Sequence, residues 1–206
     1  MPQTTSREYR RIDIHNLEVR EEQDGRMIVE GYATTFDQRY VLSTWDNYVF
    51  DEEIDPHAFD DTDMSDVIMQ YDHEGRVFAR TKNNTLALNV DNHGLHVRAY
   101  LDGTDIGRQL YQEIKGGYTD KMSFGFSVRK DQRIEEKIDG TVYFHRRITG
   151  IKKLYDVSAV SIPANDTTEI SARSYCDGVI AELEAERLAA VQRARTLLKI
   201  RLIKEE

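Results

Sequence analysis

Hydrophobic and polar residues alternate in short runs over most of the first 160 positions, which is the pattern of half-buried β-strands. The stretch from Tyr9 to Phe36 predicts a hairpin that turns at Asp24-Gly25, with Ile12, Ile14, Leu17 and Val19 before the turn. A second hairpin is predicted over residues 86–99, with its turn at 91–94. Further strand-like runs lie at residues 67–71, 122–128, 141–147 and 154–162.

Two other segments have helical spacing. Ile106, Leu110 and Ile114 recur every four residues between Thr104 and Lys115, and Gly116-Gly117 follows as a stop signal. From Gly178 to Lys204 helix formers dominate and no proline occurs, which predicts one amphipathic helix of about seven turns. We therefore predict an α+β fold, mainly antiparallel β, over residues 1–174, and a helical extension over 175–206 that packs on the domain or pairs with a partner helix.

The stretch from residue 51 to residue 66 is dense in carboxylates. They are Asp51, Glu52, Glu53, Asp55, Asp60, Asp61, Asp63 and Asp66. Such a density of like charge predicts a solvated loop or short helix. The glycine and distal glutamate of an EF-hand loop are missing, so calcium binding is not expected.

Charge and composition narrow the choice of partners. The chain has 28 Lys+Arg against 37 Asp+Glu, for a net charge of -9, which disfavours a nucleic acid or an anionic membrane as the main partner. The single cysteine, Cys176, excludes an internal disulfide framework and a multi-cysteine zinc site. No apolar run reaches the ~18 residues of a membrane span, and the first residues lack the apolar stretch of a signal peptide. The expected location is the cytoplasm.

A serine lies in one of the strand-like segments with an arrangement that suits a nucleophile. Alternation over 122–128 places four apolar residues on one face and Ser123, Gly125 and Ser127 on the other. A nucleophilic serine needs a rigid support behind it and space in front of it. Serine is also common on the solvent face of strands, so this segment alone leaves both interpretations open.

A histidine and an aspartate occupy two further strand-like segments. His73 follows the run 67–71, and an imidazole can accept and return a proton near neutrality. An ordinary surface histidine is the alternative. Asp156 shares a face with apolar residues, so its carboxylate needs a partner: a histidine that becomes cationic, or an arginine such as Arg146 or Arg147.

Several short blocks between about residues 10 and 172 carry a family resemblance. They are Glu30-Gly31-Tyr32-Ala33 with Phe36, Glu53 to Phe59, Tyr71-Asp72-His73, Thr85-Leu86 with Asn92 to Leu95, the segment ending at Gly117, Met122 to Phe126, and Tyr155 to Ala164. In this order they resemble the prohead serine proteases of tailed bacteriophages. These capsid-maturation proteases share a fold with the herpesvirus assembly proteases.

The resemblance implies a herpesvirus-protease-like β-barrel with flanking helices. It implies a serine endopeptidase that cleaves capsid and scaffold segments, and itself, inside the assembling prohead in the host cytoplasm. His73 matches the general base and Ser123 the nucleophile, while Asp156 matches an acidic position, more often Glu, as the orienting group. Ala79 stands where the family commonly has glycine.

The partners implied are the phage major capsid protein and a scaffold segment as substrates, together with self-association. No cofactor, metal, nucleic acid or membrane is implied.

Two other functions remain open on the sequence. A metal-dependent hydrolase could use His93 and His96 together with Asp91 and His73, but residues three apart in a strand point to opposite faces and no H-E-x-x-H motif is present. A non-catalytic capsid-assembly or scaffold module could use the C-terminal helix for docking. The two classes differ in whether the purified protein shortens on standing and whether the shortening needs Ser123.

Overall fold

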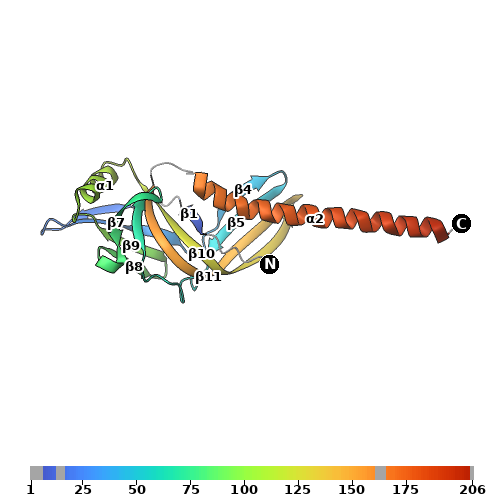
Figure 1. Ribbon diagram of the computed structural model, residues 1–206, viewed down its shortest axis with the longest axis horizontal. Helices are drawn as coiled ribbons and strands as arrows, with labels where there is room; N and C mark the ends of the chain where they lie inside the picture. Colours follow the sequence, from blue (N-terminus) through green and yellow to red (C-terminus); the bar gives the residue numbers. More distant parts are fainter. Residues whose placement is uncertain (1–6, 13–16, 161–165, 205–206) are drawn as a thin grey trace. The chain divides into compact units, whose positions relative to one another are not determined.

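The computed structural model describes residues 7–12, 17–160 and 166–204. The chain divides into two compact units, Met1–Ala172 and Arg173–Glu206. Figure 1 shows the elements coloured along the chain. In chain order they are β1 (Glu8–Ile12), β2 (Glu18–Glu21), β3 (Met27–Thr35), β4 (Tyr40–Trp45), β5 (Tyr48–Ile54), β6 (Ile68–Tyr71), β7 (Glu74–Arg80), the short 3-10 helix η1 (Thr81–Asn83), β8 (Leu86–Val90), β9 (Gly94–Tyr100), α1 (Asp105–Lys115), β10 (Lys121–Ile138), β11 (Thr141–Val160) and α2 (Asp166–Lys204).

The strands of the first unit form two sheets. The larger sheet runs β1-β10-β11-β5-β4, with β6 also paired to β11 and β7 paired to β6, and the smaller sheet runs β2-β3-β9-β8. All pairs are antiparallel except β11 with β5 and β11 with β6. The predicted α+β class with mainly antiparallel strands is confirmed, but the described strands do not close into the expected barrel.

One apolar core joins the two sheets and α1. Phe124, Phe126 and Leu154 of the larger sheet belong to the same buried cluster as Val97 of the smaller sheet and Leu110 of α1. Each of these side chains is 2% exposed or less. The apolar face predicted for residues 122–128 is therefore the core face of β10, and it supports whatever lies on the opposite side of that strand.

The local turn and helix signals are confirmed. Residues 86–99 form the β8–β9 hairpin. α1 begins after Thr104, whose side chain accepts a hydrogen bond from the Gly107 N–H, and the chain leaves the helix through Gly117 at φ 73°. Gly25, at φ 83°, supplies the left-handed turn between β2 and β3.

The first predicted hairpin is only partly correct. β2 and β3 pair as expected, but β1 leaves this hairpin and pairs with β10 in the larger sheet. Ile14 lies outside the described residues. Glu8 and Arg10 of β1 explain the difference, because both are buried and find their charged partners in the larger sheet.

The strands predicted at 122–128, 141–147 and 154–162 are parts of two much longer strands. β10 and β11 form one antiparallel hairpin that turns at Asp139-Gly140. Both strands are labelled in Figure 1. The outer part of β10 is exposed on both faces, so its sequence lacks the alternation that marks a half-buried strand. Ile162, the predicted end of the last strand, lies outside the described residues.

The acidic stretch 51–66 is not solvated throughout. Glu52 lies in β5 and is 0% exposed, because Arg10 Nε donates to its Oε1 at 2.6 Å and Arg146 donates to its Oε2 at 2.9 Å. A buried carboxylate is tolerated when charged donors satisfy it, and a run of like charges does not reveal such distant partners. After β5 the prediction holds better, since Asp60, Asp61 and Asp63 are exposed.

The second unit is helical over its described residues, 173–204. α2 begins at Asp166 rather than at the predicted Gly178, which lies inside it. A single interior glycine costs a helix only about 1 kcal/mol relative to alanine, so it does not end a helix of 39 residues. Among the residues that the structure describes, no helix is apolar enough over a sufficient length to cross a membrane.

Candidate active site

Strand pairing brings two of the three predicted residues onto neighbouring strands. Ser123 of β10 lies opposite Ser158 of β11, and Gly125 lies opposite Asp156. The serine and the aspartate therefore lie two positions apart across the β10–β11 pair. Antiparallel neighbours at this diagonal spacing are close enough for a third side chain to bridge them.

The third residue comes from a tight turn. Asp72 and His73 form the two-residue connection between β6 and β7, with φ values of 47° and 61°. A two-residue hairpin loop with both φ values positive has the twist that matches its strands. The Asp72 N–H donates to the Ala159 carbonyl at 3.0 Å and ties this turn to β11. The turn thereby aims His73 at the β10–β11 pair.

The three side chains form one hydrogen-bonded series. His73 Nε2 lies 2.6 Å from Ser123 Oγ, and His73 Nδ1 lies 2.5 Å from Asp156 Oδ1. The Ser158 hydroxyl donates to the same Oδ1 at 2.8 Å. Because a carboxylate only accepts hydrogen bonds, Nδ1 carries the imidazole proton and Nε2 is free to accept the proton of Ser123. The Ser123 hydroxyl has a second acceptor in the Arg10 carbonyl at 2.9 Å, and its single proton serves one of the two at a time. All three residues predicted from the sequence are brought together.

The site is almost closed to solvent. Ser123 is 1% exposed, Asp156 is 0% exposed, and the His73 side chain is 4% exposed. Burial, together with the positive charge of Arg7, lowers the pKa of His73 to about 4. The imidazole is therefore in its neutral, proton-accepting form at neutral pH. The small-residue face of β10 was expected to be open, but Ser127 on that face is also buried.

Arg7 is the charged partner of Asp156. Its guanidinium donates to Asp156 Oδ2, on the side of the carboxylate away from His73, and lies 4.9 Å from the ring centroids of both Tyr9 and Tyr155. The arginines suggested by the sequence are engaged elsewhere. Arg146 pairs with Glu8, Glu52 and Asp131, and Arg147 pairs with Asp37, Glu53 and Asp55.

The sequence signalled that Asp156 needs a partner, but not which one. Arg7 and Asp156 are separated by 149 positions, so only the pairing of β1 with β10 brings them together.

Gly125 supplies the space that the carboxylate occupies. A Cβ at this position would lie 2.3 Å from Asp156 Oδ2 and 2.9 Å from a ring carbon of Tyr9. Both distances are far below van der Waals contact, so a side chain at position 125 displaces Asp156 or its neighbours. The sequence pattern identified Gly125 as a small residue beside the serine without indicating this role.

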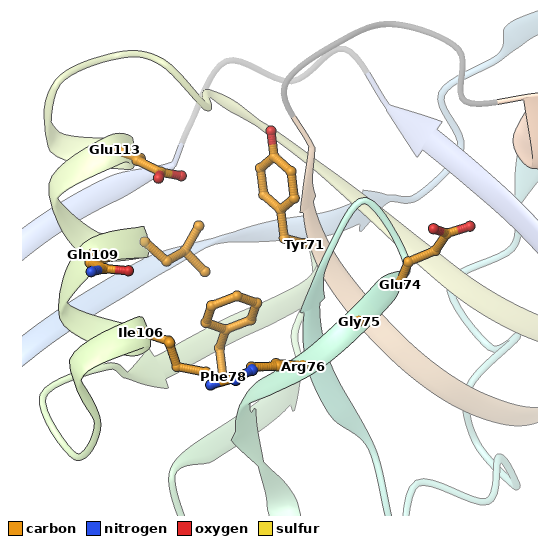
Figure 2. A pocket seen from close by; sticks show the side chains of 9 residues that line it. Tyr71, Glu74, Gly75, Arg76, Phe78, Ile106, Gln109 and Glu113 are labelled. Carbon is orange, nitrogen blue, oxygen red and sulfur yellow. The ribbon is translucent and has the colours of Figure 1, made fainter.

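A cavity lies beside the turn that carries His73, with Tyr71, Glu74 and Gly75 in its lining. Its volume is about 390 Å³, and it lies between the β6–β7 hairpin and α1 (Figure 2). Figure 2 shows Tyr71 and Phe78 extending from the hairpin, with Ile106, Gln109 and Glu113 on the helix. The remaining lining residues are Arg76 and Leu110. The interior is largely apolar, with carboxylates and one arginine among its lining.

The residues considered for a metal site are arranged differently. Within the described part of the chain, no group of three or more His, Cys, Asp or Glu side chains is placed to hold a metal ion. His93 and His96 instead both pack edge-on against the Tyr32 ring, at centroid distances of 4.5 and 5.1 Å. The Tyr32 hydroxyl donates to Asp91 at 2.8 Å. His93, His96 and Asp91 therefore contact Tyr32 rather than forming a set of metal ligands.

A comparison with known protein families agrees with the sequence resemblance. The family model described as caudovirus prohead serine protease matches residues 15–178. Among solved structures, the bacteriophage T4 capsid assembly protease, gp21, is similar with a TM-score of 0.42 and 12% sequence identity, over 77% of this chain and 97% of that chain. No curated protein matches the chain.

Proposed function

The chain belongs to the caudovirus prohead serine protease family, and we propose that Ser123, His73 and Asp156 are its catalytic triad. It is a serine protease of phage capsid maturation. The observation that carries the proposal is the unbroken series from Asp156 Oδ1 to His73 and on to Ser123 Oγ, with distances of 2.5 and 2.6 Å. A serine, a base and an orienting carboxylate in hydrogen-bond contact are the geometry of nucleophilic acyl transfer.

In the proposed reaction, Ser123 Oγ attacks the carbonyl carbon of the scissile peptide bond while its proton passes to His73 Nε2. Asp156 holds the Nδ1 proton and stabilises the imidazolium that forms. His73 then donates the proton to the leaving amine, and the C–N bond breaks to give an acyl-enzyme. Water, deprotonated by the same imidazole, then bonds to the acyl carbon. The bond from this carbon to Ser123 Oγ breaks, the second product leaves with a new carboxyl group, and His73 returns the proton to Ser123 Oγ.

A substrate carbonyl needs access to the hydroxyl of Ser123, a residue that is 1% exposed in this structure. The groups in contact with the triad therefore have to move before the first step. The cavity beside the His73 turn is a candidate space for a substrate side chain, and Tyr71, Phe78 and Ile106 in its lining suit an apolar or aromatic group.

The substrates that fit this assignment are the phage major capsid protein, a scaffold segment and the chain itself, cleaved inside the assembling prohead. We assign the protease domain to residues 1–174 and a helical extension to residues 175–206. Self-association and a relation to the herpesvirus assembly proteases are part of the same proposal.

The test is co-expression with the capsid protein of the same phage, followed by intact-mass measurement and N-terminal sequencing of the products. Ser123→Ala should abolish both capsid cleavage and shortening of the chain itself. Ser127→Ala is a matched control, because Ser127 lies on the same face of β10, is 3% exposed, and has a hydroxyl without a hydrogen-bond partner. Unchanged processing by Ser123→Ala would rule out the proposed nucleophile. Absence of any cleavage with a functional capsid partner would favour a non-catalytic assembly module.

A further inference from the structure

Residues 7–10, at the start of β1, contact every member of the triad without belonging to it. Arg7 donates to Asp156, the Tyr9 ring lies 4.5 Å from the His73 ring, and the Arg10 carbonyl lies 2.9 Å from Ser123 Oγ. The triad itself comes from the β6–β7 and β10–β11 hairpins. Because β1 pairs directly with the serine strand, its residues at alternate positions face the site.

The opposite face of β1 is firmly held. Arg10 donates to Glu52 at 2.6 Å and to Glu8 at 2.5 Å, and Arg146 donates to Glu8 at 2.8 Å. All four side chains are 4% exposed or less. Removing one partner from a buried ion cluster leaves an uncompensated charge, so this cluster fixes the position of β1 on the sheet. Arg7 therefore approaches Asp156 from an anchored strand.

The place occupied by Arg7 is specific. Its guanidinium lies between the Tyr9 and Tyr155 rings, with 4.9 Å to each centroid, and cations are attracted to aromatic faces at this distance. The carboxylate is shared, because Oδ1 accepts from His73 and Oδ2 accepts from Arg7. Gly125 leaves the room for this arrangement, since a Cβ there would lie 3.0 Å from Arg7 Nε.

We propose that Arg7 is a positioning residue, which fixes the outer oxygen of Asp156 and offsets its negative charge, so that it restrains the protonation of His73. This inference rests on the proposed triad. An imidazolium gains stability from the full charge of a carboxylate beside it, and a guanidinium on the far oxygen reduces that gain. While Arg7 is in place, Asp156 orients the His73 imidazole, but the proton affinity of this imidazole is lowered.

Among the described residues, the groups that face His73 can be named, so the effect of Arg7 can be isolated. Within that part of the chain, Asp156 and Arg7 are the charged side chains that interact with the imidazole, Tyr9 covers its ring, and Ser123 is bonded to it. Asp72 and Glu74 are its chain neighbours in the turn. Burial and Arg7 together hold the pKa of His73 at about 4, against an ordinary value of 6.5. Loss of the Arg7 charge should therefore raise the pKa of His73.

The test is an NMR titration of the His73 imidazole in the full chain carrying Ser123→Ala, which measures protonation without activity. Arg7→Met should raise the pKa of His73, and Arg7→Gln should do the same. Arg7→Lys, which keeps the charge, should leave it close to that of the parent. Arg98→Met is the matched control, because the Arg98 side chain is 33% exposed against 34% for Arg7, pairs with Glu22 and Glu30, and lies over the Tyr100 ring. It should cause no shift.

An unchanged pKa of His73 in both neutral variants would overturn the inference. In the active chain, the acid limb of the plot of kcat/KM against pH should shift to higher pH in Arg7→Met, by as much as the pKa of His73 rises. A merely structural loss would instead lower kcat/KM equally at all pH values. The outcomes separate this inference from the proposed function. Continued cleavage by Ser123→Ala would refute the triad, while the titration would still report whether Arg7 controls His73.

Discussion

Replacement of Gly125 by alanine is the sharpest structural perturbation of the proposed triad. The new methyl group would lie 2.3 Å from Asp156 Oδ2. Carbon and oxygen atoms need about 3.4 Å or more, so the carboxylate or the backbone has to retreat by about 1 Å. The carboxylate is also held by Ser158 and Arg7, so a displacement breaks or lengthens these hydrogen bonds.

The size of the effect follows from this displacement. A misplacement of about 1 Å in a catalytic group costs roughly 10²-fold in rate, and overpacking a well-packed site costs about 1–3 kcal/mol of folding free energy. We expect Gly125→Ala to lower kcat by about 10²-fold or more, with KM less affected. The chain should remain folded at room temperature, with a lower melting temperature.

Gly103→Ala is the control. A Cβ at Gly103 meets no heavy atom within 4 Å, so the same substitution adds the same methyl group without a clash. Both variants should be assayed on a peptide that spans a cleavage site mapped by N-terminal sequencing, and their melting temperatures compared. Activity of Gly125→Ala equal to that of Gly103→Ala would refute the reasoning, because it would mean that position 125 does not limit the placement of Asp156.

Three further predictions concern the orienting group, the base and the cavity. Asp156→Asn should keep the fold by circular dichroism but lower kcat by about 10⁴-fold, because an amide no longer fixes the Nδ1–H tautomer of His73; a loss below tenfold would argue against the orienting role. The pKa of His73 is about 4 in the folded chain, against an ordinary value of 6.5. As the pH falls, the unfolded state therefore takes up the proton first, which favours unfolding. About 3 kcal/mol of the folding stability present above pH 6.5 should be lost by pH 4. Urea unfolding at pH 7 and pH 4.5 should show a smaller loss in His73→Gln, and an identical loss would exclude this source. Gln109→Trp should fill the cavity and raise KM several-fold with kcat little changed. Gln112 is exposed on the same helix but lies outside the cavity lining, so Gln112→Trp should leave KM unchanged. Equal KM values in the two variants would show that the cavity does not bind substrate.

Local features of the fold could be predicted from the sequence because short-range chemistry determines them. The recurrence of Ile106, Leu110 and Ile114 located α1, and the turn residues located the β8–β9 hairpin. The alternation around Ser123 located the core face of β10. Each of these features depends on residues within a few positions of one another.

Features that depend on distant pairing could not be predicted in the same way. Glu52 looked like part of a solvated acidic run, but Arg10 and Arg146 make it a buried residue. The buried face of Asp156 predicted a charged partner, and its identity as Arg7 depends on the choice of β10 as the neighbour of β1. A strand pattern specifies which face is buried and leaves open which strand lies beside it.

The position of His73 combines both kinds of information. The family resemblance identified the residue, while the tight turn explains how it is aimed. Its positive φ is a conformation that few side chains adopt, and histidine is among those enriched there.

The most direct measurement of the central claim is covalent labelling of the nucleophile. A preparation that cleaves the capsid protein should be treated with a fluorophosphonate, and the modified residue located by intact mass and peptide mapping. We expect one adduct, on Ser123, that forms at least about 10²-fold more slowly in His73→Ala, because general-base assistance contributes rate factors of this size. An adduct on another serine, or equal labelling of Ser123 without His73, would contradict the proposed triad.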